Sequence, residues 1–297
     1  MVHALTAAQS QGMDCVQVFT KNQRQWSVKP LVEVDIDSWF TQLRDMGWDN
    51  TNRVVSHNSY LVNLASPDAD ARNRSIALQR EEIERCERLH IPALVSHPGA
   101  RLGTPRKTSE KNNIGKNPTK EELDGLKRIA TSLDQLHKEL PNYKTRICLE
   151  TTVGSGTNLG YDFQHLAMVR NEVSEPERVA CCFDTCHVTA AGYDMHTESK
   201  AESVLQQFDD IAGLDLISVF HFNDSIGGIG SRKDRHAHIG QGACGLACFR
   251  TIVKNPRFDH VPKILETSKE VNEQGRLMDV VNISKLRSMQ TRARKRR

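Results

Sequence analysis

The chain has 297 residues, of which 38% are hydrophobic, with 40 lysines and arginines against 37 aspartates and glutamates. This length suits one large domain or two small ones, and so large a hydrophobic share excludes wholesale disorder. The sequence contains no apolar run long enough to span a bilayer, and its first residues lack the basic-then-apolar order of a secretory signal. We therefore expect a folded protein with no membrane partner.

Short apolar, β-branched runs alternate along the chain with longer amphipathic stretches. Residues 1–14 are predicted to contain the first helix, and later helices are expected at residues 68–89, 118–139 and 199–213. The predicted strands are residues 15–19, 53–56, 93–96, 146–149, 179–183, 216–220 and 263–265. Alternating strands and helices are typical of a parallel sheet with crossover helices, and continuous apolar strands indicate burial on both faces.

The length and the alternation favour an α/β fold, the (β/α)8 TIM barrel. Such a barrel needs eight strands, and the sequence predicts seven. We therefore expect a barrel that lacks its first β-strand at the N-terminus, an incomplete version with unpaired edges on the strands at 15–19 and 263–265. Residues 1–284 contain no linker and are predicted to form this single barrel domain.

The net charge of +3 is unevenly distributed. Residues 285–297 hold seven basic residues and no acidic one, and subtracting these seven charges leaves −4 on residues 1–284. We expect 285–297 to form a basic C-terminal tail that directs the protein to the nucleus, with the mitochondrion as a second possibility. The alternative interpretation is a solvated tail without a partner. A basic stretch at 101–119 predicts a long loop facing a polyanion.

Side chains that can bind metal ions follow six of the seven predicted strands. His57, His97, Glu150, Asp184, His221 and Glu266 come directly after their strands, His187 lies three residues beyond Asp184, and Asp234 and His236 occupy the loop after His221. The carboxyl ends of parallel barrel strands meet on one rim, where barrel active sites lie. We therefore expect these nine side chains to converge.

Clustered carboxylates repel one another, and neutral imidazoles cannot balance their charge, whereas divalent cations can. Nine ligands are too many for one tetrahedral zinc ion, so the set would serve two or three metals. Mixed imidazole and carboxylate ligands suit zinc best. Manganese or iron fits such a ligand set less well, and calcium fits it least. Several metal ions on a barrel rim, each with a coordination position left for water or substrate, favour hydrolysis of a phosphoester.

Eight sequence blocks resemble the endonuclease IV family of apurinic/apyrimidinic (AP) endonucleases. They are FTKNQRQW at 19–26, HNSYLVNL at 57–64, HPG at 97–99, LETTVGSGTNLG at 149–160, FDTCHVTAAGYD at 183–194, HFND at 221–224, DRHAHIGQG at 234–242 and LET at 265–267. The resemblance implies a TIM barrel with three zinc ions. It also implies cleavage of the phosphodiester on the 5′ side of an abasic site in duplex DNA, leaving a 3′-hydroxyl, and removal of blocked 3′ ends.

The resemblance also divides the ligands among the ions. His57, His97 and Glu150 would hold one zinc; Glu150, Asp184, His221 and Glu266 a second; and His187, Asp234 and His236 the third. Glu150 and Glu266 are predicted to be catalytic, and Arg24, Tyr60, Leu61 and Arg235 to bind DNA.

An abasic nucleotide must leave the base stack to reach a rim pocket, and apolar or aromatic side chains can fill the gap it leaves. Tyr60 and Leu61 are placed for this role, although ordinary loop packing explains them too, and Arg235 could be a solvated arginine. The glycine-rich stretch at 154–160 lacks a Walker lysine, so we expect no nucleotide cofactor. We also expect a monomer.

Two other functions stay open at this point. An incomplete barrel could bind abasic DNA without cleaving it. A sugar isomerase or epimerase could use a similar metal-bearing barrel, but it would not need the loops at 19–26 and 57–64 or the basic tail.

Overall fold

The computed structural model describes residues 1–106 and 114–294. Seven strands form one parallel sheet in the order β1-β2-β3-β4-β5-β6-β9, which wraps into a TIM barrel. The strands are β1 (Val16–Val18), β2 (Val54–His57), β3 (Ala93–Ser96), β4 (Arg146–Glu150), β5 (Val179–Asp184), β6 (Ile217–His221) and β9 (Lys263–Ile264). A separate hairpin pairs β7 (Asp224–Ser225) with β8 (His236–Ala237) in antiparallel fashion. The predicted fold class is thus confirmed.

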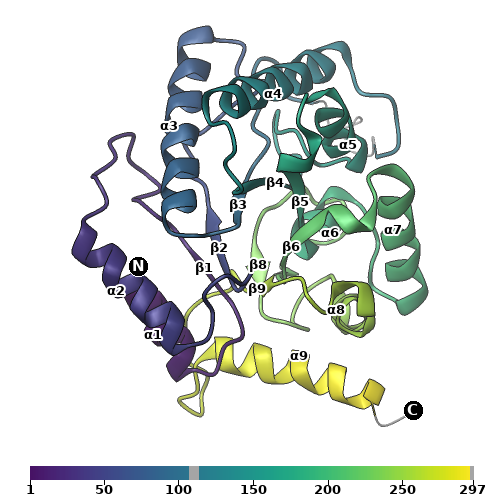
Figure 1. Cartoon of the computed structure of the whole chain (residues 1–297). Helices are drawn as coiled ribbons and strands as arrows, with labels where there is room; N and C mark the ends of the chain where they lie inside the picture. The colour runs from purple at the N-terminus through teal and green to yellow at the C-terminus, as the bar shows by residue number, and fades with distance from the viewer. Residues whose placement is uncertain (107–113, 295–297) are drawn as a thin grey trace.

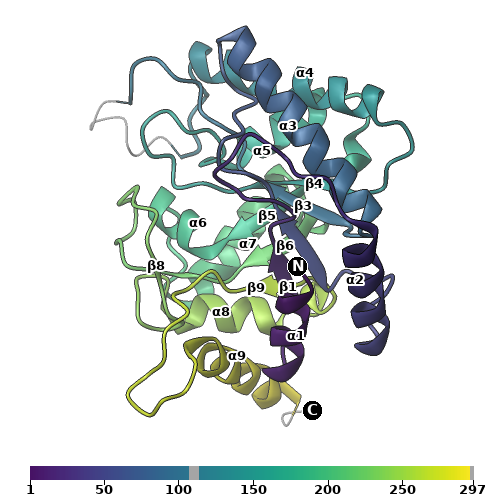
Figure 2. The same cartoon turned by 90° about the vertical axis from the view of Figure 1, so that its left-hand side faces the viewer.

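Helices surround the strands on their outer side (Figures 1 and 2). They are α1 (Val2–Ser10), α2 (Glu33–Asp45), α3 (Ala69–Arg88), α4 (Lys120–Glu139), α5 (Phe163–Glu172), α6 (Thr185–Ala191), α7 (Glu198–Ile211), α8 (Gly245–Lys254) and α9 (Met278–Arg294). The described residues also contain the short 3-10 turns η2 (Pro176–Arg178), η3 (Leu214–Leu216) and η4 (Pro256–Phe258). Local signals fix several helix starts: Asp68 caps α3, and Thr119 forms a capping box with Glu122 at the start of α4.

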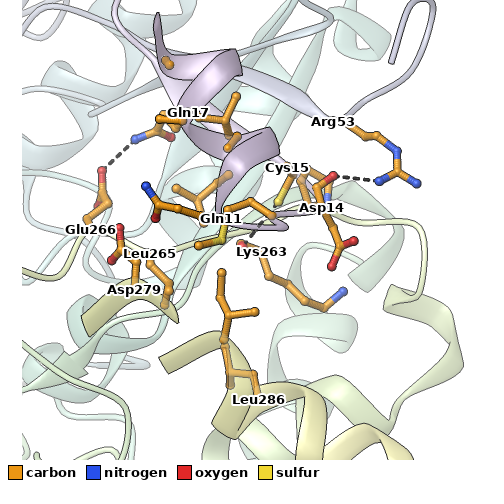
Figure 3. Close-up of a pocket in the computed structure, with 18 of the residues that line it drawn as sticks. Gln11, Asp14, Cys15, Gln17, Arg53, Lys263, Leu265, Glu266, Asp279 and Leu286 are labelled. Atoms are coloured by element: carbon orange, nitrogen blue, oxygen red, sulfur yellow. Dashed lines mark hydrogen bonds between the residues drawn. The ribbon is translucent and has the colours of Figure 1, made fainter. Parts of the chain in front are cut away.

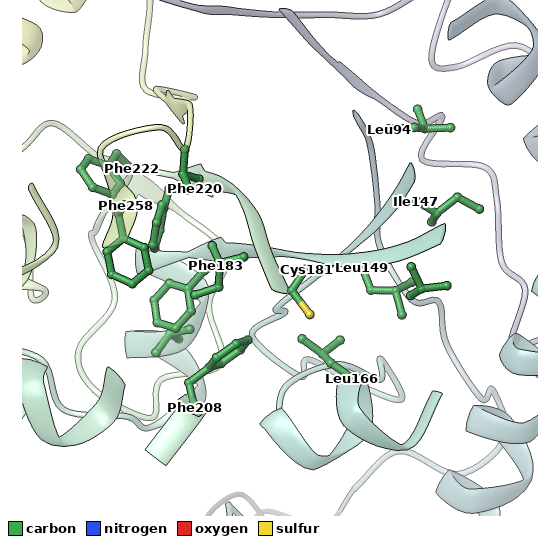
Figure 4. Close-up of a cluster of buried hydrophobic side chains, with 14 of the residues drawn as sticks. Leu94, Ile147, Leu149, Leu166, Cys181, Phe183, Phe208, Phe220, Phe222 and Phe258 are labelled. Atoms are coloured by element: carbon green, nitrogen blue, oxygen red, sulfur yellow. The ribbon is translucent and has the colours of Figure 1, made fainter. Parts of the chain in front are cut away.

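Two apolar layers hold the barrel together. Inside it, small and β-branched side chains from alternating positions fill the interior, among them Val55, Val95, Ala180 and Val219. Outside it, larger side chains pack between strands and helices, and Figure 4 shows the aromatic part of this layer, where Phe183 and Phe220 meet Phe208 and Phe258. The strands are therefore buried on both faces, which explains their continuous apolar sequences.

The sheet has a seam between β1 and β9, its two outermost strands. Within the described residues these strands share no backbone hydrogen-bonded ladder. Side chains bridge the seam instead: the Cys15 thiol lies 3.5 Å from the Lys263 carbonyl oxygen, and the Gln17 amide lies 2.8 Å from a Glu266 oxygen. A cavity of about 900 Å³ opens here between α1, β1, β9 and α9 (Figure 3). The predicted seven strands and the two unpaired edges are present.

Residues at the C-terminal end differ from the expected free tail. Helix α9 continues through the predicted boundary at residue 284, and Leu286 and Met289 are buried. The Lys285 ammonium donates to the Ile239 carbonyl, and Arg287 pairs with Asp14 at 2.7 Å. These two basic residues therefore contact the body of the protein. The last three residues, and the central part of the basic 101–119 stretch, lie outside the described residues.

Candidate metal centre

The nine predicted ligands converge at the carboxyl ends of the barrel strands. Four of them are the last residues of their strands: His57 of β2, Glu150 of β4, Asp184 of β5 and His221 of β6. His97 directly follows β3, and Glu266 lies two residues beyond β9. The parallel arrangement explains this convergence, because every strand delivers its last side chain to the same rim.

Two shorter elements supply the other ligands. Asp184 caps α6 by accepting a 2.7 Å hydrogen bond from the backbone N–H of His187, which places His187 in the first turn of that helix. The β7–β8 hairpin carries His236 and holds Asp234 just before it. Asp234 is the most exposed ligand, with 48% of its side chain accessible.

Glu150 is the centre of the cluster. One of its oxygens lies 3.3 Å from His57 Nε2 and 3.0 Å from His97 Nε2. The other lies 2.9 Å from His221 Nδ1 and 3.2 Å from His187 Nδ1. The carboxylate is completely buried, so its negative charge needs positive partners. Protonated imidazoles, or metal ions held between the carboxylate and its neighbouring ligands, can supply that positive charge.

The ligand atoms fall into groups of the size that metal ions need. Within each group the atoms lie within 4.8 Å of one another. Three groups contain only histidine and carboxylate: His57, His97 and Glu150; Glu150, Asp184, His221 and Glu266; and His187, Asp234 and His236. Two further groups would use the thiols of Cys182 or Cys186. Burial raises the pKa of both thiols, that of Cys186 to about 12, so a thiolate ligand is disfavoured there.

The acidic groups and histidines of the cluster shift one another's pKa values even without metal ions. Burial alone would raise the pKa of Glu150 and Glu266, but the surrounding histidines, His221 foremost, together outweigh it and hold both pKa values below the usual range. Burial alone would lower the pKa of His187 and His221, but the surrounding acidic groups outweigh it and raise both. The folded chain thus favours charged Glu150 and Glu266 carboxylates facing protonated His187 and His221 imidazoles, and divalent cations can replace those protons.

Two buried ring nitrogens test whether these residues fit a metal ion. His187 Nε2 and His236 Nε2 have no hydrogen-bond partner within the described part of the chain. Asp234 lies 3.2 Å and 3.3 Å from them, respectively, without suitable hydrogen-bond geometry. A buried polar nitrogen without a hydrogen-bond partner lowers the stability of the fold, because its lost hydration is not replaced. An ion shared by these two nitrogens and the carboxylate would satisfy all three groups, so the set fits a cation.

Backbone carbonyls orient three of the histidines. His57 Nδ1 donates to the Asn58 carbonyl at 2.8 Å, His187 Nδ1 to the Thr151 carbonyl at 2.8 Å, and His236 Nδ1 to the Glu266 carbonyl at 3.3 Å. In each ring this leaves Nε2 as the nitrogen that can ligate a metal. Such partners of metal-binding histidines fix the tautomer and the ring orientation.

Two residues that the sequence reasoning missed complete the cluster. The buried Asn223 amide donates to Asp184 at 2.7 Å and to Glu266 at 3.3 Å, and its oxygen accepts from the Glu266 N–H at 2.8 Å. Its place two residues after His221, in the HFND block, was the available signal. Gln17 of β1 contacts both His221 and Glu266. A lone glutamine within an apolar strand gave no comparable signal.

The four predicted DNA-binding residues lie near this rim but differ in exposure. Tyr60 is 56% exposed, and its ring centre lies 5.4 Å from that of His57 and 5.9 Å from that of His97. Leu61 is half-buried against the core, whereas Arg24 and Arg235 are exposed. The Ser59 hydroxyl donates to the Gln23 carbonyl at 2.7 Å and so joins the loop of Arg24 to that of Tyr60 and Leu61.

The two described arginines at the start of the 101–119 stretch are less available to a polyanion than their charge implies. Arg106 is buried in an ion pair with Glu122, 2.8 Å away, and it lies over the Tyr161 ring at 4.1 Å. Arg101 donates to the Leu102 and Thr104 carbonyls. Lys107 and Lys111 lie outside the described residues. Arg106 therefore anchors the loop to α4 and is not free to contact a substrate.

The fold and the cluster together define the class of protein. It is a TIM barrel whose rim carries five histidines and four carboxylates close enough to share metal ions. Among the helices of the described residues, none combines the length and the apolar character needed to cross a membrane.

Comparison with known proteins identifies the family. Residues 5–283 match the family described as the xylose isomerase-like TIM barrel. The chain is 41% identical over 278 residues to the "Probable endonuclease 4" of Trichlorobacter lovleyi, an alignment that covers 94% of this chain and 91% of the relative. The crystal structure of endonuclease IV from Thermus thermophilus matches with a TM-score of 0.79 and 27% identity, over 98% of this chain and 94% of that one. The chain belongs to the endonuclease IV family of AP endonucleases and is an enzyme of that type, which confirms the predicted resemblance.

The comparisons also bear on the alternatives. The crystal structure of a D-tagatose 3-epimerase-like protein matches with a TM-score of 0.68 over 99% of this chain and 96% of that one. At 19% identity this likeness shows the fold alone, whereas relatives at about 41% identity carry the endonuclease name.

The predicted nuclear or mitochondrial location is wrong. The relatives from Trichlorobacter lovleyi, Chloroflexus aggregans and Geotalea daltonii, at 41–42% identity, are bacterial proteins, and bacteria have no nucleus. The structure gives a physical reason for the misreading. Lys285 and Arg287, counted as part of a free basic tail, lie on α9 and bind groups in the body of the protein.

Proposed function

We propose that the protein is a zinc-dependent AP endonuclease. It would hydrolyse the phosphodiester 5′ to an abasic site in duplex DNA, leave a 3′-hydroxyl, and remove blocked 3′ ends. The observation that carries this proposal is the buried Glu150 carboxylate, which faces four histidine nitrogens within 3.3 Å and belongs to two adjacent ligand groups. Such sharing of one carboxylate suits neighbouring ions, as in two-metal phosphoesterases.

Three zinc ions would be held by the three histidine–carboxylate groups described above. Bound there, they would supply Lewis-acid stabilisation of the negative charge that develops on the phosphate. Of the two carboxylates proposed as catalytic, Glu150 is fully buried and would position the ions, whereas the side chain of Glu266 is 20% exposed. Asn223 would keep Asp184 and Glu266 in their orientations through its three hydrogen bonds.

The loops around the cluster would bind the damaged DNA. Tyr60 offers an exposed aromatic ring within 6 Å of two ligand histidines, so it can fill the space of an extruded nucleotide while that nucleotide enters the rim. Leu61 and Arg24 are proposed to act beside it, and the Ser59–Gln23 hydrogen bond would keep their loops together. Arg235 is exposed next to Asp234 and is proposed to contact a backbone phosphate.

An incision assay tests the proposal. The zinc-loaded protein is incubated with a labelled duplex that contains one tetrahydrofuran abasic analogue, and the products are tested for extension by a DNA polymerase. We expect incision on the 5′ side and an extendable 3′-hydroxyl, and we expect a 3′-phosphate-blocked duplex to become extendable as well. Retention of the duplex without incision would instead indicate a DNA-binding protein that does not cleave. If the duplex is neither cut nor retained, both the nuclease and the binding protein are refuted.

Two histidine substitutions make this assay specific. His57→Ala removes a buried ligand next to Glu150, so incision should be lost. His3→Ala makes the same chemical change at an exposed position on α1, so incision should be unaffected. Equal activity of the two variants would contradict the proposed role of the cluster.

A further inference from the structure

Gln17 links two proposed metal ligands that come from opposite edges of the sheet. It lies in the middle of β1, and its side chain reaches the rim residues Glu266 and His221. Its amide nitrogen donates to Glu266 Oε1 at 2.8 Å, an interaction visible in Figure 3. Its amide oxygen lies 2.8 Å from His221 Nε2. One side chain therefore contacts two members of the group formed by Glu150, Asp184, His221 and Glu266.

These two contacts determine which way the amide and the imidazole are oriented. An ionised carboxylate can only accept hydrogen bonds, so the NH2 group of Gln17 must face Glu266. The amide oxygen must then face His221, and an oxygen there requires His221 Nε2 to carry a proton. Nδ1 is thereby assigned to the carboxylates, 2.9 Å from Glu150 and 3.1 Å from Glu266.

His221 differs in this respect from the other oriented histidines. His57, His187 and His236 donate from Nδ1 to backbone carbonyls and direct Nε2 towards the cluster. His221 does the reverse, and its orienting partner is a side chain. A backbone carbonyl cannot be removed by substitution, but the Gln17 amide can. The tautomer of His221 is thus open to a direct test.

The location of Gln17 gives it a second effect. β1 and β9 are the two outermost strands of the sheet, and within the described residues they share no backbone ladder. Glu266 follows β9, which is paired on one side only, with β6. The hydrogen bond from Gln17 therefore restrains Glu266 from across the seam, in addition to the support that Asn223 gives from the segment after β6.

We propose that Gln17 is a positioning residue, which holds His221 with its proton on Nε2 and fixes Glu266 across the seam. It would thereby set the affinity for the metal ion held by Glu150, Asp184, His221 and Glu266. This inference rests on the proposed function. Partners of this kind change metal affinity by about 10- to 100-fold when they are substituted. The ions of the other two groups should be affected less, because the side-chain hydrogen bonds of Gln17 to proposed ligands in the described residues go to His221 and Glu266.

The experiment compares Gln17→Met with Gln11→Met. Methionine keeps the length of the side chain but removes both hydrogen bonds. Gln11 lines the same seam cavity without contacting a ligand, so it receives the identical change as a control. The affinity of each bound Zn²⁺ is measured in the full chain by stepwise competition with a chelator. Substituting Co²⁺ gives an absorption spectrum that reports the ligand geometry. We expect one of the three ions to bind at least about tenfold more weakly in Gln17→Met, with an altered Co²⁺ spectrum, and no change in Gln11→Met.

A second measurement reads the tautomer itself. Nitrogen-15 NMR of histidine-labelled, zinc-loaded protein should show one ring with a protonated Nε2 and a metal-bound Nδ1. That Nε2 proton should exchange with solvent much faster in Gln17→Met. If the Met variant does not fold, Gln17→Ala provides the same comparison with less bulk. A residue that acts only in packing would change the melting temperature of the metal-free protein but neither zinc affinity nor proton exchange.

The failure of this inference differs from that of the proposed function. If the unsubstituted chain binds no zinc, the proposed metal centre is wrong and the inference falls with it. If the unsubstituted chain binds three ions, and Gln17→Met binds all three with affinities within twofold and an unaltered His221 signal, then the role of Gln17 alone is overturned.

Discussion

Replacing Glu150 with glutamine should remove two of the three proposed zinc ions. Glu150 is shared by two ligand groups, whereas the group of His187, Asp234 and His236 does not include it. Zinc content should therefore fall from three ions to one per chain. Glutamine preserves the shape of the side chain, so the loss can be assigned to the charge.

The same substitution should destabilise the metal-free protein. Glu150 is completely buried, and four histidine nitrogens lie within 3.3 Å of its oxygens. Removing one partner of a buried charge pair costs about 3–5 kcal/mol of unfolding free energy. A loss of this size is a large part of the roughly 5–15 kcal/mol that stabilises a typical domain. The loss should be greatest at a pH below the raised folded pKa values of His187 and His221, where both imidazoles carry a positive charge.

Elemental analysis of purified protein after zinc loading and gel filtration measures the ion content, and urea unfolding of the metal-free protein measures the stability. Asp234→Asn is the matched control, because Asp234 belongs to one group only and should cost a single ion. Three ions retained in Glu150→Gln, or the same loss in both variants, would refute the sharing of Glu150 between two sites.

Three further results are expected. Tyr60→Ala should weaken binding to abasic duplex by about 1–3 kcal/mol, the usual contribution of an aromatic ring stacked on bases. Its zinc content should not change. Equal affinity of the variant and the unsubstituted protein in a fluorescence titration would contradict the role of Tyr60. Arg106→Ala should lower the unfolding free energy by about 3–5 kcal/mol, because it leaves the buried Glu122 without its charged partner; a loss below about 1 kcal/mol in urea would show that the pair is dispensable. Folding raises the pKa of His187 and His221 above 6.5, so the stability that they contribute is complete below pH 6.5 and is lost as pH rises through their folded pKa values. The metal-free protein should therefore lose stability as the pH rises above 6.5. Zinc should protect it increasingly, because fewer protons compete for the ligands. A gap between the melting temperatures of the zinc-loaded and metal-free proteins that narrows with pH would contradict this assignment.

The prediction of the ligand set shows how far strand-end reasoning reaches. His57, Glu150, Asp184 and His221 were recognised because each ends an apolar run, and in a parallel sheet that position alone places the side chain on a common rim. Gln17 was missed because its role depends on β1 and β9 facing each other across the seam, and these strands are separated by most of the chain.

Basic residues in the sequence predict binding surfaces less well than strand ends predict metal ligands. The sequence predicts that Arg106 faces a polyanion and that Lys285 and Arg287 belong to a basic tail. In the structure Arg106 pairs with Glu122, Lys285 binds the Ile239 carbonyl, and Arg287 pairs with Asp14. Counting charges along the chain cannot show which acidic group or carbonyl folding will bring beside each of them.

The sequence by itself determined the parallel barrel, the family and the nine clustered side chains. Each of these follows from local patterns: apolar runs of strand length, their alternation with amphipathic helices, and the residues directly after each strand. Only the tertiary structure decided that Glu150 lies between four histidines, that Gln17 orients His221, and that α9 binds its basic residues to the barrel. These features depend on distances between residues remote in sequence, which are fixed when the strands close around the core.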